Sequence, residues 1–395
     1  MTEIGEAPRI DLSDTEVVRD PFGAYGRARE GGPVARLAAP GFGDMWAVTR
    51  HAEARALLGD PRFVINEHSF LPPDVPDDCK PYMRTMSEMN GAAHIRLRRL
   101  VSPAFTARRA AAFGPRIAPL VDRLLNDLPP GDPVDLTEHL ARPLPMDVIC
   151  ELVGIPEADR RQWRAYGVTV ASVAGPEFAA AIPGIMAGAR RAVAAAREAP
   201  GDDVIGDLVR VQAEDGDRLT DAELITLVWH LVMAGQTPGN LIANAVAALL
   251  THPEQLAALR ADPGLMPRAV DELIRWCGPT LLTVPRYARE DVDLHGVQVR
   301  AGEPVTAVVA SANRDPRVFA DPDRLDVRRD PGPGHLGFAH GAHFCLGASV
   351  ARVETAEALT ALLDRFPDLA LAVPVEGLRA PDPGTWRLTG LPVNR

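Results

Sequence analysis

The sequence predicts a mainly α-helical fold with a minor β region, formed as a single large domain over residues 1–395. Long segments repeat apolar residues with a helical period, and short β-rich pieces lie between loops rich in proline and glycine. No fixed-period repeat or clear interdomain linker divides the chain. Hydrophobic residues make up 46% and charged residues 24% of the sequence, a balance typical of a globular protein with a sizeable core.

Helical periodicity is strongest in the first two thirds of the chain, where we expect helices over 105–128, 136–153, 179–198 and 221–250. The last of these is the longest. Thr220 can cap its first turn, and His252 followed by Pro253 ends it. Apolar residues cover most of its circumference, as expected for a helix that crosses a core.

The β region consists of short segments rich in β-branched residues. We expect strands over 34–37, 45–49, 283–288, 297–301 and 305–309. Two loops rich in proline and glycine, 71–81 and 330–334, separate the predicted elements.

Charge and composition exclude several classes of function. The net charge of −11 argues against nucleic acid as a partner. The N-terminal residues contain neither a basic region nor an apolar run, so we expect no signal peptide or membrane anchor, and a cytoplasmic location. Four dispersed cysteines without Cys-x-x-Cys spacing indicate neither a zinc site nor a disulfide framework.

The most informative residue is Cys345, which lies among glycines and aromatic residues just before a helical pattern. Unpaired N–H groups and the dipole at a helix N-terminus lower the pKa of a thiol and favour the thiolate. Gly341 and Gly347 lack a Cβ, which leaves room for a large flat group against the backbone. A thiolate that ligates haem iron needs these features, so Cys345 is the candidate metal ligand.

The residues around this cysteine resemble the haem-binding loop of the cytochrome P-450 family, here 335–347. The matching positions are Phe338, Gly341, His343, Cys345 and Gly347. The resemblance covers nearly the whole chain and implies the fold of that family, with haem b (iron protoporphyrin IX) as cofactor.

Charged residues elsewhere extend the resemblance. Glu272 and Arg275 resemble the Glu-x-x-Arg pair of the family, on the helix behind the haem, and we expect Arg324 or Arg328 to close that cluster. The resemblance also implies partners for the haem propionates, for which arginine suits a carboxylate well. These candidates are His94, Arg98, Arg286 and His343.

The long central helix departs from the family pattern, which usually contains an acid followed by a threonine that together feed protons to dioxygen. The corresponding residues, our candidate catalytic set, are Ala234, Gly235, Gln236, Thr237 and Pro238. Thr237 stands at the position of the acid and Pro238 at that of the threonine. Because proline lacks an N–H and costs ~3 kcal/mol in a regular helix, we expect a kink and the loss of the usual proton relay. Gln236, Thr237 or Asn240 remains available to position water.

The resemblance places a substrate pocket beside the central helix. Its candidate residues are His230, Met233, Leu282, Val284 and Trp386. His230 is either a polar group in a mostly apolar cavity or a histidine turned towards a neighbouring helix and bonded to its backbone, and the sequence favours neither.

Two functional interpretations remain open. The first is a monooxygenase that inserts one atom of dioxygen into a small natural-product-like molecule. The second is a related enzyme that couples, cyclises or desaturates its substrate without inserting oxygen. A non-enzymatic haem sensor or carrier is a less favoured interpretation than either of these.

The sequence lacks a flavin or nicotinamide fingerprint, so electrons must come from a separate protein, for which we expect a ferredoxin with its ferredoxin reductase. A basic patch near the cysteine side of the haem is expected to steer this partner. Its predicted members are Arg98, Arg99, Arg108, Arg109 and Arg352. The chain is expected to act as a monomer.

Overall fold

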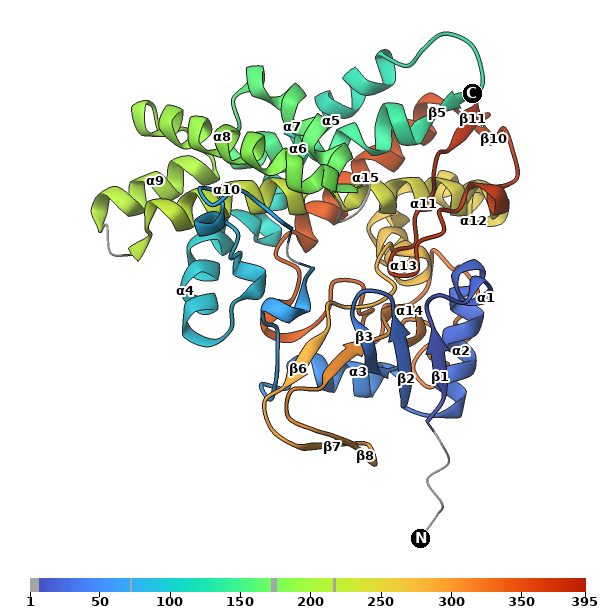
Figure 1. The fold of residues 1–395 in the computed structure, drawn as a ribbon. Coiled ribbons are helices and arrows are strands. Elements are labelled where there is room, and N and C mark those ends of the chain that lie inside the picture. The colour runs from blue at the N-terminus through green and yellow to red at the C-terminus, as the bar shows by residue number, and fades with distance from the viewer. Residues whose placement is uncertain (1–6, 72, 172–175, 216–217) are drawn as a thin grey trace.

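The computed structural model describes residues 7–71, 73–171, 176–215 and 218–395. Helices fill the larger part of the molecule, and a sheet with its covering helices lies to one side, near the described N-terminal strand (Figure 1). The predicted fold class, mainly α with a minor β region, is confirmed.

The α-helices are α1 (Thr15–Arg19), α2 (Pro21–Gly31), α3 (His51–Gly59), α4 (Gly91–Val101), α5 (Ala107–Asn126), α6 (Pro143–Val153), α7 (Glu157–Ala171), α8 (Pro176–Glu198), α9 (Val204–Glu214), α10 (Asp221–Ala234), α11 (Pro238–Thr251), α12 (Pro253–Ala261), α13 (Met266–Cys277), α14 (Val309–Ala312) and α15 (Ala348–Arg365). The strands are β1 (Arg9–Asp11), β2 (Val34–Ala39), β3 (Gly43–Val48), β4 (Phe63–Val64), β5 (Val134–Asp135), β6 (Arg286–Ala288), β7 (Val292–Leu294), β8 (Val297–Val299), β9 (Pro304–Ala307), β10 (Ala370–Leu371) and β11 (Pro392–Asn394).

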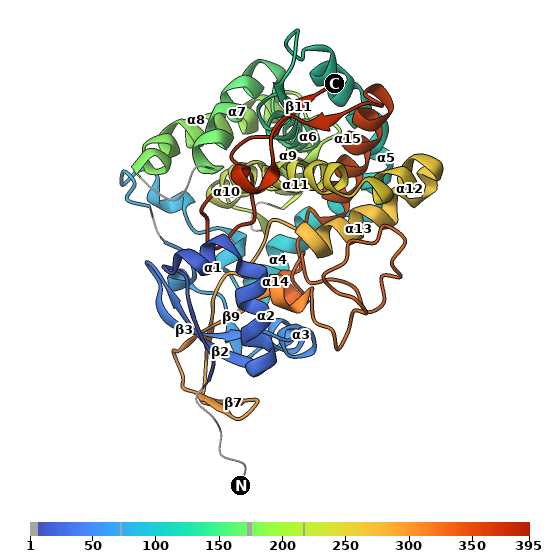
Figure 2. The same cartoon turned by 90° about the vertical axis from the view of Figure 1, so that its right-hand side faces the viewer.

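The larger sheet joins strands from the N-terminal part of the sequence to strands after α13. Its strand order is β1-β2-β3-β9-β6-β4, in which β2 and β3 are antiparallel and β3 is parallel to β9. The pairing of Trp46 with Val305 therefore fixes the N-terminal third of the chain against the segment after α13. Helices α2 and α3 lie beside this sheet (Figure 2), and the turn after α3 contributes to the site described below.

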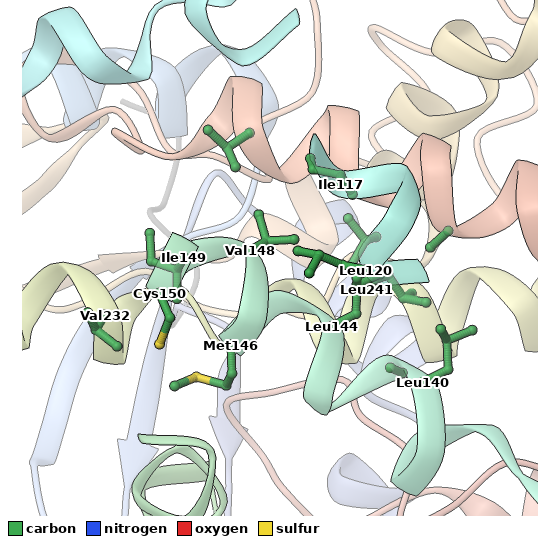
Figure 3. Packing of buried hydrophobic residues seen from close by; sticks show 14 of the residues in the cluster. Ile117, Leu120, Leu140, Leu144, Met146, Val148, Ile149, Cys150, Val232 and Leu241 are labelled. Carbon is green, nitrogen blue, oxygen red and sulfur yellow. The ribbon is translucent and has the colours of Figure 1, made fainter. Parts of the chain in front are cut away.

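The helical part is built around α10 and α11, which follow one another across it (Figure 1). Helix α6 packs against α5, α10 and α11, and α5 packs along α15. Figure 3 shows Leu144 and Val148 of α6 among these helices, together with Leu120 of α5 and Leu241 of α11. Removal of this apolar surface from water stabilises the arrangement by roughly 25 cal/mol per Å² buried. The same packing holds α15, and the loop that leads into it, in a fixed position relative to α10.

The predicted elements were located correctly, but two of the long helices are divided. The prediction of one continuous helix over 221–250 is wrong, because α10 ends at Ala234 and α11 begins at Pro238. The segment predicted over 136–153 divides into a π-helical turn at Thr137–Ala141 and α6, which begins at Pro143. In both cases proline occupies the first helical turn, where its missing N–H costs nothing.

Among the described helices, none combines the length and the apolar composition that a membrane span requires.

Candidate active site

Cys345 lies at the end of a loop that leads directly into α15. Its N–H donates to the carbonyl oxygen of Phe338 at 2.9 Å, which closes the loop, and Gly347 precedes the first turn of the helix. The side chain of Cys345 is exposed and forms part of the wall of a cavity. The predicted position of this thiol, at the N-terminus of a helix and open to a large space, is confirmed.

The electrostatic prediction for this thiol is wrong for the protein alone. Burial raises the pKa of Cys345 above its ordinary value, and this effect outweighs four influences that lower it. These are hydrogen bonds from the backbone of Gly347 and Ala348 and the charges of Arg98 and Arg352. The helix terminus thus acts in the predicted direction, but a further cation beside the sulfur is needed to make the thiolate the favoured form.

The cavity has a volume of about 440 Å³, and most of its described lining residues are apolar. It brings together the cysteine loop, both central helices, the segment before β6 and residues from α4. The predicted site residues that line it are His94, Arg98, His230, Ala234, Gly235, Thr237, Pro238, Leu282, Val284, Arg286, Phe338, His343, Cys345 and Gly347. Residues up to 253 positions apart in the sequence therefore meet at one site, from His94 to Gly347.

Four basic side chains gather in the wall of this cavity. The rings of His94 and His343 lie with their centroids 4.4 Å apart. Arg98 donates to the carbonyl oxygen of Phe344, one residue before the cysteine. Arg286, which is 6% exposed, joins them from β6.

These four side chains lack a counter-charge. Burial lowers the pKa of His343 to about 4, with the neighbouring His94, Arg286 and Arg98 adding to the effect. Burial likewise lowers the pKa of Arg286 to about 10, and burial with the charge of Arg98 lowers that of His94. No carboxylate among the described residues forms an ion pair with any of the four, so the cluster is suited to an anionic ligand.

The two glycines of the loop are required for different reasons. Gly341 has a φ of +77°, and a Cβ at this residue would lie 2.5 Å from the carbonyl oxygen of Leu58. It does not line the cavity; it lets the loop approach the end of α3. A Cβ on Gly347 would meet no atom within 4 Å, and this residue does line the cavity. Gly347 therefore leaves open space on the cavity side.

The central helix is interrupted where it borders the cavity. Between α10 and α11, the carbonyl oxygen of Ala234 accepts from the hydroxyl of Thr237 at 3.5 Å, since Pro238 has no N–H to offer. Gly235 permits a close approach to α6, because a Cβ there would lie 2.6 Å from the side chain of Ile149. The kink predicted at Pro238 is a complete break in the structure, since α10 ends at Ala234 and α11 begins at Pro238.

Three predicted residues lie outside the cavity lining. Gln236 is turned away from it, and its Oε1 is buried without a hydrogen-bond partner among the described atoms. Met233 is 5% exposed within the core, since one residue along a helix turns a side chain about 100° away from Ala234. Trp386 packs edge-on against Phe22, with ring centroids 4.8 Å apart. The prediction that Met233 and Trp386 line the pocket is therefore wrong.

His230 adopts the first of the two arrangements that the sequence left open, a polar group in a mostly apolar cavity. It lines the cavity, and its Nε2 lies 3.0 Å from the hydroxyl oxygen of Ser87. Its partner is thus a side chain rather than a neighbouring backbone. Burial lowers the pKa of His230 to about 4, so the ring is neutral at physiological pH.

An ion cluster behind the cavity holds the segment that leads to the cysteine loop. Arg275 donates to both carboxylate oxygens of Glu272, at 2.6 and 2.8 Å, and both side chains are 3% exposed. Arg329 closes the cluster, with its Nε 3.1 Å from Glu272. The prediction of Arg324 or Arg328 is wrong. Arg324 contributes only its carbonyl oxygen, and the N–H of Arg328 bonds to Asp326.

Comparison with known proteins identifies this arrangement. Residues 264–370, which include the Glu272 cluster and the cysteine loop, match the family model described as Cytochrome P450. Cytochrome P450 monooxygenase PikC of Streptomyces venezuelae is 41% identical, over 98% of this chain and 94% of its own. The chain belongs to the cytochrome P450 family. The predicted enzyme class, a cytochrome P450 monooxygenase, is confirmed by this near full-length similarity.

Two further cytochromes P450 show the range of chemistry among the relatives. Mycinamicin IV hydroxylase/epoxidase of Micromonospora griseorubida is 41% identical over 90% of this chain and 91% of its own. A solved structure, the cytochrome P450 enzyme CxnD for C–S bond formation in chuangxinmycin biosynthesis, has a TM-score of 0.84 and is 32% identical, covering 94% of this chain and 93% of its own.

The cytochrome P450 family is characterised by a haem with a cysteine thiolate ligand, and the cavity of this chain fits such a group. A large flat group needs open space beside the thiol, which Gly347 leaves free. Its carboxylates need cations, and the four basic side chains without counter-charge supply them. The iron is also the cation that the thiol of Cys345 requires.

Sequence reasoning missed three residues of this cytochrome P450 site: Ser87, Arg329 and Glu354. Ser87 lies in a single short helical turn and Arg329 in an irregular segment, and neither has a periodicity that predicts which side chain meets which. Glu354 lies on α15, 2% exposed, and burial raises its pKa well above the ordinary value. Its spacing from Gly347 and Ala351 was the available signal, since residues three or four apart lie on one face of a helix and all three line the cavity.

Proposed function

We propose that this cytochrome P450 oxidises a small natural-product-like molecule in the cavity above Cys345, with dioxygen and with electrons from a separate protein. The observation that carries the proposal is the juxtaposition in one cavity of an exposed thiol, four basic side chains without counter-charge and an otherwise apolar wall. Such a cavity can hold a charged cofactor at one end and an apolar substrate at the other.

Haem b is the proposed cofactor, with Cys345 as its thiolate ligand. The proposed propionate partners are His94, Arg98, Arg286 and His343. When bound, the haem supplies an iron centre that activates dioxygen. Phe338 and Gly347 border the same space, and Arg352 lies over the Phe338 ring at 4.6 Å from its centroid, which fixes that ring in place.

The interruption between α10 and α11 is the proposed route for protons. The carbonyl oxygen of Ala234 lacks an N–H partner four residues on, and the Thr237 hydroxyl that bonds to it also lines the cavity. These oxygens can hold an ordered water, which would deliver protons in place of the acid and alcohol that relatives usually carry.

A ferredoxin is the proposed electron donor. Arg108 and Arg109 are exposed at the start of α5, which packs along α15, and Arg99 is exposed at the end of α4. Arg352 is not available for docking, since its guanidinium pairs with Asp271 at 2.7 Å. Attraction between exposed arginines and an acidic partner weakens with salt, so the electron-transfer rate should fall as ionic strength rises.

The second candidate function is bond formation without oxygen insertion. It is favoured by the absence of the usual acid and alcohol at Thr237 and Pro238, and by the similarity to an enzyme of C–S bond formation. Both functions use the same cavity and cofactor, and they differ in the fate of the oxygen.

Turnover under labelled dioxygen tests the two functions. Haem-loaded protein, a ferredoxin, its reductase and NADPH are incubated with candidate polyketide and terpenoid substrates under oxygen-18, and products are analysed by mass spectrometry. One labelled oxygen in the product supports the monooxygenase. A product without label, formed only in the complete mixture, supports coupling or desaturation, and turnover without the ferredoxin would contradict the separate electron donor.

A further inference from the structure

A polar contact crosses the cavity wall between two segments far apart in the sequence. Ser87 lies in the short helix η3 (Met86–Glu88), and His230 lies on α10. Their side chains are joined by the 3.0 Å contact between the Ser87 hydroxyl and His230 Nε2, and both residues line the cavity.

Neighbouring hydrogen bonds hold both members of this pair in place. The segment before α4 lies against α10, where the carbonyl oxygen of Tyr82 accepts from Thr226 at 3.2 Å and from Trp229 at 3.0 Å. On the other side of Ser87, the carboxylate of Glu88 accepts from the N–H and hydroxyl of Thr85. The pair is therefore preorganised, which lowers the entropic cost of binding a ligand.

The pair retains hydrogen-bonding capacity that the protein does not use. A serine hydroxyl has one hydrogen to donate and two lone pairs, and the contact with His230 uses one of these three. The remaining capacity of the Ser87 oxygen is available to a ligand on the cavity side. Burial keeps the His230 ring neutral, so the pair has no net charge.

No charged side chain among the described residues bonds to this pair, and burial is the only cause of the lowered pKa of His230. The basic group formed by His94, Arg98, Arg286 and His343 is gathered around the cysteine loop. Glu354 of α15 is the single carboxylate among the described lining residues, and Glu88 is engaged with Thr85 and does not line the cavity. A charged substrate group beside Ser87 and His230 would thus be buried without a counter-ion, at considerable cost.

We propose that Ser87 and His230 form an anchor for an uncharged oxygen function, such as a hydroxyl or carbonyl group, on an otherwise apolar substrate. This inference rests on the proposed function, because it takes the cavity as the substrate site. It narrows the substrate class to neutral molecules and excludes those that present an amine cation or a carboxylate to this part of the wall.

Three ligands with the same rigid apolar body test the anchor: 1-adamantanol, trimethyl(1-adamantyl)ammonium and adamantane-1-carboxylate. None of them carries a nitrogen that can ligate iron, and their dissociation constants for haem-loaded protein are measured by equilibrium dialysis. We expect the alcohol to bind at least about tenfold more tightly than either ion. Equal affinity for the three ligands, or no detectable binding of the alcohol, overturns the proposal.

Substitutions then assign this preference to the pair. His230→Phe and Ser87→Ala should each weaken binding of the alcohol by about fivefold, and the double variant should add little, since both remove one shared anchor. His230→Gln, which keeps a hydrogen-bonding group, should retain part of the affinity. Met233→Leu, a core substitution three residues from His230, should leave it unchanged. Alcohol binding that is unaffected in both single variants refutes the anchor.

The reduced carbon-monoxide spectrum of each sample separates this inference from the proposed function. A wild-type sample without the red-shifted Soret band of a thiolate-ligated haem contradicts the proposed function itself. A normal band in every variant, combined with no preference for the alcohol, contradicts the anchor alone.

Discussion

Replacement of Glu272 by glutamine tests the idea that the ion cluster on α13 holds the segment leading to Cys345. The amide keeps the shape of the side chain and removes its charge. In the native protein, one Glu272 oxygen accepts from Arg275 Nη2, from Arg329 and from the N–H of Asp326, and the other accepts from Arg275 Nε at 2.6 Å. Glu272→Gln leaves two arginines facing a neutral amide.

The size of the effect follows from burial. Loss of one partner from a buried ion pair costs about 3–5 kcal/mol, because the remaining charge has no counter-ion. Arg275 keeps hydrogen bonds to three carbonyl oxygens, those of Asn313, Pro322 and Arg324. These bonds still satisfy much of the guanidinium, so we expect the lower end of that range, about 3 kcal/mol.

The assay is urea unfolding of the haem-loaded protein, followed both by far-UV circular dichroism and by the Soret band. Glu16→Gln is the matched control, since Glu16 pairs with Arg19 at 4.0 Å and both side chains are exposed, so that loss of the pair costs less than about 1 kcal/mol. The Soret transition of Glu272→Gln should occur at lower urea than in wild type and control. Equal losses of stability in the two variants would refute the reasoning.

Three further predictions concern the loop, the central helix and the buried histidine. Gly341→Ala should lower the free energy of unfolding by roughly 2 kcal/mol in thermal unfolding, because this residue has a positive φ and its Cβ would contact Leu58. Gly347→Ala should leave the stability of the apoprotein unchanged and weaken haem binding in a haem titration. Pro238→Thr should give an equal or lower amount of product per NADPH consumed with the native substrate. A large rise in this ratio would show that the proline lowers the efficiency with which NADPH consumption is coupled to product formation. In the folded protein the pKa of His230 is about 4, below its ordinary 6.5, so the contribution of this residue to stability is complete above pH 6.5 and is lost as the pH falls towards 4. His230→Phe should therefore remove up to about 3 kcal/mol of the decrease in unfolding free energy between these pH values. Identical pH profiles of stability for the wild type and the variant would contradict this prediction.

The sequence was most informative where one local pattern decides the structure. The spacing of glycines and aromatic residues around Cys345 predicted a loop before a helix, and a proline at position 238 predicted a distortion at the place where α10 and α11 are separate helices. In both cases the cause lies within a few residues: glycine permits the loop, and proline removes an N–H.

Where tertiary contacts decide the structure, the sequence was less informative. Arg329 rather than Arg324 or Arg328 reaches Glu272, because the irregular segment before the cysteine loop has no periodicity to fix side-chain direction. Trp386 lies against Phe22, a contact between the two ends of the chain. The pKa of Cys345 also depends on burial by distant elements, which outweighs the local effect of the helix terminus.

The most direct test of the central claim is the carbon-monoxide spectrum of the reduced protein and of its Cys345→Ser variant. We predict that the wild type shows the strongly red-shifted Soret band of thiolate ligation and that the variant lacks it. Cys277→Ser, at a buried cysteine whose thiol bonds to the carbonyl oxygen of Leu273 at 3.2 Å, is the control and should keep the band. An unchanged band in Cys345→Ser would contradict the assignment of the metal ligand and, with it, the proposed function.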